Sequence, residues 1–81
     1  AGQVLGLSIF KFTRPLGIGS RGTDVKELQK RLLAVGLFAG DITGYFGPIT
    51  HGAVKLFQKK NGLEQVGSVG PKTRELLGKL K

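Results

Sequence analysis

The chain has 81 residues, enough for one small domain that buries only about 60% of the surface its unfolded chain exposes. It has no Cys, one His and five scattered carboxylates, which disfavours disulfide frameworks, metal sites and paired acid/base groups. A formal net charge of +8 favours polyanionic partners such as nucleic acid, anionic lipid or the phosphates and carboxylates of a cell wall. We therefore expect no enzyme activity, no cofactor and no metal.

The first segment predicts an extended arm rather than a membrane span. The apolar run Val4 to Phe12 is broken by polar residues and glycine and is far too short to cross a bilayer. Apolar residues then alternate with basic residues, Pro and Gly as far as Ile18. We expect residues 1–11 to be a linker or N-terminal arm and residues 12–81 to form the domain, excised from a larger secreted or envelope protein.

A short pattern recurs three times and predicts three helix starts. It reads Gly, then Thr or Pro, any residue, then Val or Thr. Glycine can serve as the N-cap, and proline suits the first helical position because its missing N–H would be unpaired there. Thr50 and Thr73 fall near the third helical position, where we expect them to help close the first turn. The copies are Gly22-Thr23-Asp24-Val25, Gly47-Pro48-Ile49-Thr50 and Gly70-Pro71-Lys72-Thr73.

Apolar residues after each start recur at helical spacing and predict one shared core. The first helix is expected to end at Gly36, the second to run from Pro48 to Lys60 before Asn61-Gly62, and the third to begin near Pro71. The segments between helices, 37–46 and 63–69, predict turns flanked by short extended pieces. The three stripes are Val25, Leu28, Leu32 and Val35; Ala53, Val54 and Phe57; and Leu76, Leu77 and Leu80.

Taken together, these segments resemble the peptidoglycan-binding domain family. The resemblance is carried by Gly22 to Gln29, Gly44 to Gln58 and Gly67 to Leu76, and it extends from about Phe12 to Leu80. It implies an all-α fold, a small three-helix orthogonal bundle with an extended N-terminal arm. It also implies that the domain holds an attached wall enzyme on bacterial peptidoglycan, in the envelope or outside the cell, without catalysis of its own.

The expected ligand site is a shallow groove between residues 38–46 and the neighbouring helix surfaces, which would contact glycan or stem peptide. Tyr45 offers an aromatic face and a hydroxyl, while Asp41 and Thr43 can bind amide or hydroxyl groups, although both also stabilise turns locally. The family often has Asp-Gly where this chain has Thr43-Gly44 and Val66-Gly67. The candidate residues are Phe38, Asp41, Thr43, Tyr45, Arg31 and Gln58.

Several polar residues on the predicted helices have structural interpretations. Gln29 and Gln58 each follow an apolar residue, so their amides are expected to bond loop backbone at the edge of the core. Arg31 is expected on a solvated helix face, where Glu27 can pair with it at a spacing of i,i+4. His51 has no partner ligands in sequence and is expected at the surface.

Two other functions remain open from the residues. Basic charge and three short helices fit a nucleic-acid-binding domain, although Pro48 to Gly52 is a poor set for reading base edges, so no nucleic acid is expected. Alternatively, the arm from Val4 to Phe12 serves in protein interaction or autoinhibition by docking on a neighbouring domain.

Overall fold

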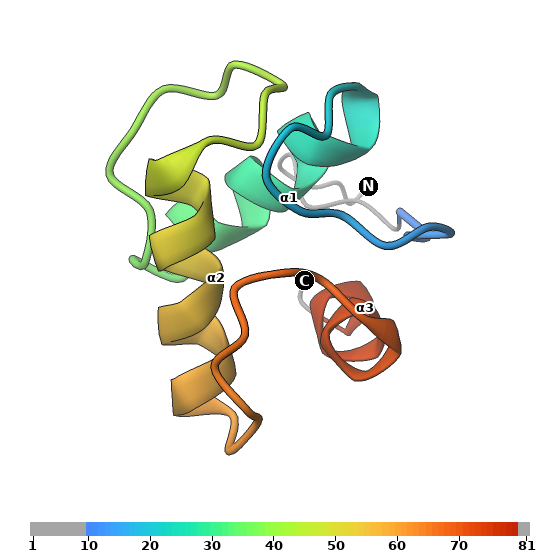
Figure 1. Cartoon of the computed structure of the whole chain (residues 1–81), viewed down its shortest axis with the longest axis vertical. Helices are drawn as coiled ribbons and strands as arrows, with labels where there is room; N and C mark the ends of the chain where they lie inside the picture. Colours follow the sequence, from blue (N-terminus) through green and yellow to red (C-terminus); the bar gives the residue numbers. More distant parts are fainter. Residues whose placement is uncertain (1–9, 80–81) are drawn as a thin grey trace, which may run out of the picture.

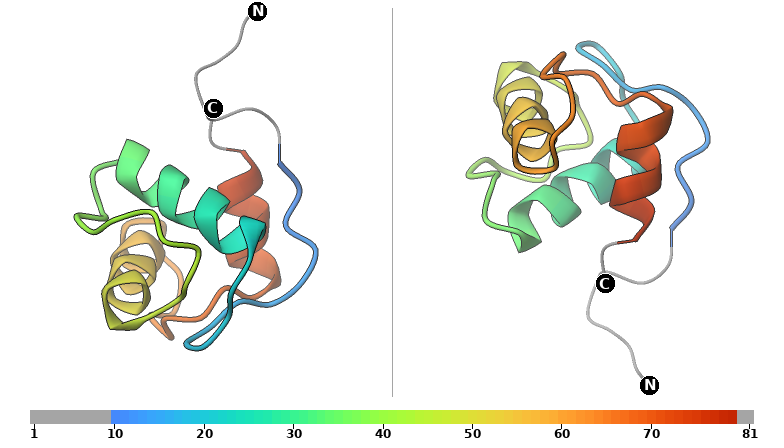
Figure 2. Two further views of the ribbon diagram at one scale, coloured as in Figure 1. Left: turned by 90° about the horizontal axis from the view of Figure 1, so that it is seen from above. Right: turned by 90° about the horizontal axis from the view of Figure 1, so that it is seen from below.

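Three helices account for the regular structure of the described residues. The computed structural model describes residues 10–79, which contain α1 (Thr23–Ala34), α2 (Pro48–Lys60) and α3 (Pro71–Gly78). The helices cross at steep angles, with α1 packed across α2 and α3 lying beside α1 (Figures 1 and 2). Residues 10–79 contain no strand. They contain two isolated antiparallel bridges, which join Leu16 to Val69 and Arg21 to Tyr45. The predicted all-α class is confirmed. No helix in the described range is long and apolar enough to span a membrane.

The repeated glycines begin all three helices, as predicted. Gly22, Gly47 and Gly70 are the N-cap residues, and proline occupies the first turn of α2 and α3. No side chain caps these ends. Each glycine carbonyl instead accepts the first helical hydrogen bond, which for α2 comes from His51 N and for α3 from Arg74 N.

Helices α1 and α2 end in the same hydrogen-bonded reversal. Leu37 N donates to Leu32 O at 2.9 Å, and Leu63 N donates to Gln58 O at 2.8 Å. This closure ends α1 at Ala34 rather than at Gly36. The prediction that Val35 lies in the core is therefore wrong: it follows the last helical residue and is 40% exposed.

The core lies where the three apolar helix faces and the N-terminal arm meet. Fully burying one large apolar side chain contributes about 1.5–3 kcal/mol, so a few such residues from each segment suffice for a small domain. Leu80, predicted for the third stripe, lies outside the described residues. The buried apolar residues are Phe12, Leu16, Val25, Leu28, Leu32, Phe38, Phe46, Ala53, Val54, Phe57, Val69 and Leu77.

The arm packs against its own domain. Phe12 and Leu16 are buried, and Leu16 exchanges backbone hydrogen bonds with Val69 on the segment that leads into α3. Phe10 meets the Phe12 ring edge to face, with 5.0 Å between ring centroids. In Figure 2 the arm runs along the side of α3. Ile18 departs from the predicted pattern and is exposed. The division at residue 11 stays a prediction, and residues 4–9 lie outside the described range.

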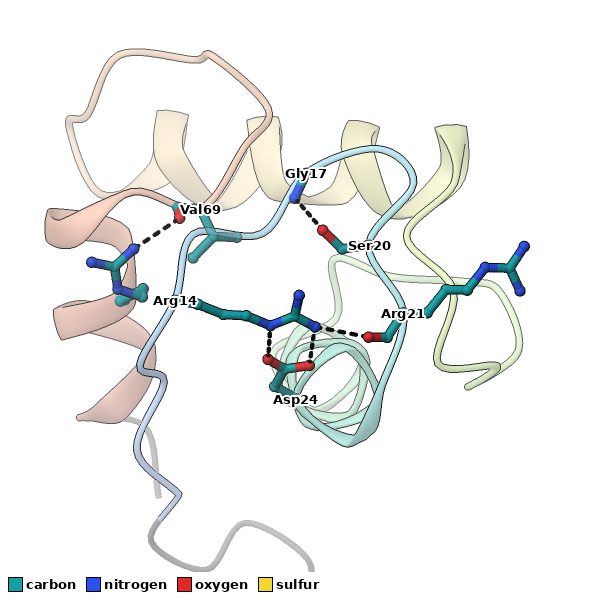
Figure 3. Close-up of polar contacts among 7 residues, drawn as sticks. Arg14, Gly17, Ser20, Arg21, Asp24 and Val69 are labelled. Atoms are coloured by element: carbon teal, nitrogen blue, oxygen red, sulfur yellow. Dashed lines mark hydrogen bonds and ion pairs between the residues drawn. The ribbon is translucent and has the colours of Figure 1, made fainter.

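An ion pair fastens the arm to the start of α1. Arg14 donates from Nε to Asp24 Oδ2 at 2.7 Å and from an Nη to Asp24 Oδ1 at 3.0 Å (Figure 3). A further bond from Arg14 reaches the carbonyl of Arg21 at 2.7 Å. The bond from Arg14 lowers the pKa of the Asp24 carboxyl below its usual 3.8.

Acid should break this attachment. Because the pKa of Asp24 is lower in the folded state than in the unfolded state, the pair stabilises the fold above the unfolded value and is lost as the pH falls through the folded value. Urea unfolding of the wild type and of Asp24→Asn, from about pH 6 to about pH 2, should show the wild type losing its advantage in acid. A difference in unfolding free energy that does not change with pH would contradict this assignment.

Gly67 shows why a glycine is required before α3. Its φ is 85°, and a methyl group added there would overlap the His51 ring on α2. We expect Gly67→Ala to lower the free energy of unfolding by about 1–3 kcal/mol. Adding His51→Ala should restore only the part of the stability that is lost to the overlap, since the backbone strain at residue 67 persists.

Gly52→Ala on α2 is the matched control, because nothing lies within 4 Å of the added carbon. It should stabilise the protein by about 0.5–1 kcal/mol through helix propensity. Thermal and urea unfolding measure both effects. A Gly67→Ala protein as stable as the wild type would show that the close approach of His51 does not constrain this turn.

Candidate functional site

Loop 37–47 and the start of α2 enclose a depression of about 280 Å³, which we call the first groove. Its lining includes four of the predicted residues: Phe38, Asp41, Thr43 and Tyr45. The predicted loop and the predicted helix start therefore do meet at a hollow surface. Sequence reasoning missed Ile49, which lines the same groove from the first turn of α2 and is 65% exposed.

The groove has an apolar floor and a mixed rim. Phe38 is 5% exposed and belongs to the core, so it supplies a fixed apolar surface. Tyr45 is 39% exposed, and its ring carries the Arg21 guanidinium 4.6 Å from the ring centroid. Asp41 and Thr43 are exposed beside it. A ligand with both an apolar part and hydrogen-bonding groups suits such a surface.

A buried glutamine of α1 fixes the shape of this loop. Gln29 is 1% exposed, and its Oε1 accepts hydrogen bonds from Thr43 N at 2.9 Å and Gly44 N at 3.0 Å. Its Nε2 donates to Tyr45 O at 3.0 Å and to the Thr50 hydroxyl at 3.1 Å. One side-chain amide thereby satisfies three loop backbone groups and joins α1 to α2, which confirms the structural interpretation of Gln29.

Gln58 performs the same task one repeat later. Its Oε1 accepts from Gly67 N at 2.9 Å, while its Nε2 donates to Ser68 O at 2.8 Å and to the Thr73 hydroxyl at 3.2 Å. The sequence analysis expected Thr50 and Thr73 to close the first turn of their own helices. The structure gives their hydroxyl groups a different role. Buried at the third helical position, each receives a hydrogen bond from the glutamine of the preceding helix.

Gln58 does not reach the first groove. It lines a separate depression of about 520 Å³, which we call the second groove, together with Leu63, Val66 and Lys72. Its side chain is 1% exposed, and the amide bonds the loop before α3. The expectation that it joins Tyr45 in one site is therefore corrected, because it braces the following loop instead.

Arg31 also lies elsewhere than predicted. The side chain is fully buried, although it was expected on a solvated face. The predicted pair with Glu27 forms at 2.8 Å, Nε donates to Leu77 O at 3.3 Å, and the guanidinium lies 5.5 Å from the centroid of the Phe12 ring. The arm and α3 cover the face of α1 that carries Arg31. The apolar periodicity of α1 alone does not predict this coverage, because the covering segments are distant in the sequence. Arg31 does not line the first groove.

Titratable groups are dispersed. Within residues 10–79 no three His, Asp or Glu side chains gather as metal ligands would. Asp24 and Glu27 are paired with basic side chains, Asp41 lies at the first groove, and Glu64 lies at the second. His51 lies against Gly67.

Comparison with known proteins identifies the fold and its family. The profile of the peptidoglycan binding domain matches residues 21–77. The crystal structure of the SleB N-terminal domain superposes with a TM-score of 0.80 at 38% identity, covering 84% of this chain and 93% of that chain. A Burkholderia AP3 phage endolysin superposes with a TM-score of 0.74 at 42% identity, covering 79% of this chain and 24% of that one. The chain belongs to the peptidoglycan binding domain family.

Curated relatives are longer proteins that contain a similar segment. A spore cortex-lytic enzyme of Bacillus cereus is 44% identical over 61 residues, which is 75% of this chain and 24% of the enzyme. The N-acetylmuramoyl-L-alanine amidase CwlM of Mycobacterium tuberculosis is 42% identical over 52 residues, or 64% of this chain and 13% of that protein. The chain thus spans about a quarter or less of these relatives.

Proposed function

We propose that this domain is a non-catalytic module that retains a longer bacterial envelope or secreted protein on peptidoglycan, and that the first groove is its contact surface. The observation that carries the proposal is the groove itself: an apolar floor, a half-exposed aromatic ring and polar rim residues, with the backbone of residues 43–45 held by Gln29. Relatives named as cortex-lytic enzymes and amidases support peptidoglycan as the binding partner, since such proteins contain a segment similar to this chain.

The arrangement of the acids supports a binding role. Asp41 and Glu64 line different grooves, and the other described acids pair with basic side chains. A general acid/base pair needs two groups within reach of one substrate bond. The domain therefore supplies affinity, and a partner domain in the same longer protein supplies the chemistry.

The affinity of this groove alone is modest. A shallow hollow of about 280 Å³ covers only a few sugar or amino-acid units. Linkage to another domain that binds the same polymer raises the effective concentration of each site for the other. Such a module keeps its partner near the wall while still allowing it to move from one site to the next.

The two alternatives are less well supported. The curated relatives are named as a spore cortex-lytic enzyme and an N-acetylmuramoyl-L-alanine amidase, whereas the start of α2 from Pro48 to Gly52 offers few groups that could read base edges. For the docking arm, Phe12 is already buried in this domain's own core. The hypothesis that the arm docks on a neighbouring domain therefore rests on residues 4–9, which lie outside the described residues.

Binding to washed bacterial sacculi tests the proposal. We expect the wild-type domain to sediment with sacculi at physiological salt, and Tyr45→Ala to bind about tenfold less because a half-buried aromatic contact is removed. Leu56→Ala is the matched control, since Leu56 is an exposed apolar residue of α2 outside the grooves.

Three outcomes would count against the proposal. Equal retention of the wild type on sacculi and on an inert resin would reject wall binding. Release of soluble muropeptides during the incubation would reject the non-catalytic role. Equal losses for Tyr45→Ala and Leu56→Ala would place the contact surface elsewhere.

A further inference from the structure

A basic hollow adjoins the first groove. This basic pocket, of about 340 Å³, is lined by Arg21, Lys26, Thr43, Tyr45 and the backbone around Gly22 and Gly44. Thr43 and Tyr45 line both hollows, so the two adjoin at these residues. A ligand in the first groove can therefore extend past Tyr45 into the basic pocket.

The two basic side chains lie against residues 44 and 45 of the loop. Arg21 pairs with Tyr45 in an isolated antiparallel bridge, and its guanidinium lies over the Tyr45 ring. Figure 3 shows its side chain extending away from the Arg14–Asp24 pair. The stem of Lys26 lies along Gly44, close enough that a carbon added at Gly44 would be 3.2 Å from Lys26 Cε. Both side chains therefore line one small hollow.

No acid of residues 10–79 neutralises these cations. Neither Arg21 nor Lys26 forms an ion pair in that range. The nearest acids along the chain are already engaged, because Asp24 binds Arg14 and Glu27 binds Arg31 and Lys30. An arginine over an aromatic ring is well placed to bind a carboxylate through two parallel hydrogen bonds while its other face stays on the ring.

We infer that the domain recognises the stem peptide of peptidoglycan, with a free carboxylate in the basic pocket and the adjoining aliphatic side chains in the first groove. This inference rests on the proposed function. Glycan sugars whose lactyl carboxyl group is amide-linked to a stem peptide offer only uncharged hydroxyl, N-acetyl and amide groups, so they would leave Arg21 and Lys26 without an anionic partner. Phosphate polymers would pair with the cations but would leave the apolar floor at Phe38 and Ile49 unused. A stem peptide uses both halves of the site.

The experiment titrates the domain with a synthetic stem tetrapeptide bearing free carboxylates and with the same peptide fully amidated. The free peptide should bind and shift the amide resonances of Arg21 and Tyr45. The amidated peptide should bind about tenfold more weakly, as should the free peptide to Arg21→Gln or Lys26→Gln, because a charge-assisted hydrogen bond is lost. Lys59→Gln removes the same charge at the far end of α2 and should leave the affinity unchanged.

Several outcomes would overturn the inference. Equal affinity for the free and amidated peptides would exclude carboxylate recognition. Inorganic phosphate that competes as well as the peptide would reduce the pocket to a general anion site. If peptide-free glycan chains and sacculi bind but the peptides do not, the stem-peptide assignment is wrong while wall binding stands. If sacculi also fail to bind, the proposed function fails with it.

Discussion

Two buried glutamine amides determine the arrangement of this domain. Gln29 on α1 and Gln58 on α2 each bond the loop that precedes the next helix and the threonine in its first turn. Loops without regular structure carry backbone groups that must be paired when they are buried, and here one side chain serves several of them. Each buried group left unpaired would cost about 1–3 kcal/mol, so these two residues matter more than their surface area suggests. Exposed side chains of the first groove lie on the loop whose shape depends on Gln29.

Local sequence signals predicted the helices well because the causes are local. Gly-Pro starts and apolar periodicity depend on a few neighbouring residues, and α2 begins and ends at the predicted residues. Long-range contacts explain what was missed. Arg31 is buried by an arm and a helix distant in the sequence, and Thr50 bonds a glutamine 21 residues away. Of the six predicted site residues, the four on one loop meet at the first groove, since a short loop keeps its residues together, whereas Arg31 and Gln58 point elsewhere.

The structure divides its polar residues between buried supports and the exposed surface that we propose as the binding site. Gln29, Gln58 and Arg31 are buried and bonded within the domain. The residues exposed around the two adjoining hollows are Asp41, Thr43, Tyr45, Arg21 and Lys26. Rigid support beneath an exposed binding surface lowers the entropy lost on binding, which matters most when the surface is small. The second groove repeats the same support but has Ser68 and Lys72 where the first has Tyr45 and Ile49. Similar frames can therefore present different surfaces.

Amide hydrogen exchange in Gln29→Met and Gln58→Met tests the central role of the glutamines most directly, because methionine keeps the length of the side chain but removes the amide. Faster exchange is expected at Thr43 and Gly44 but not Gly67 in the first variant, and at Gly67 but not Thr43 or Gly44 in the second, with Leu28 and Val54 amides protected in both. Sacculus binding should fall only in Gln29→Met, whose loop forms the first groove. Unchanged protection of Gly44 and Gly67 in these variants would contradict the account, since the loops would then hold their shape without the amides.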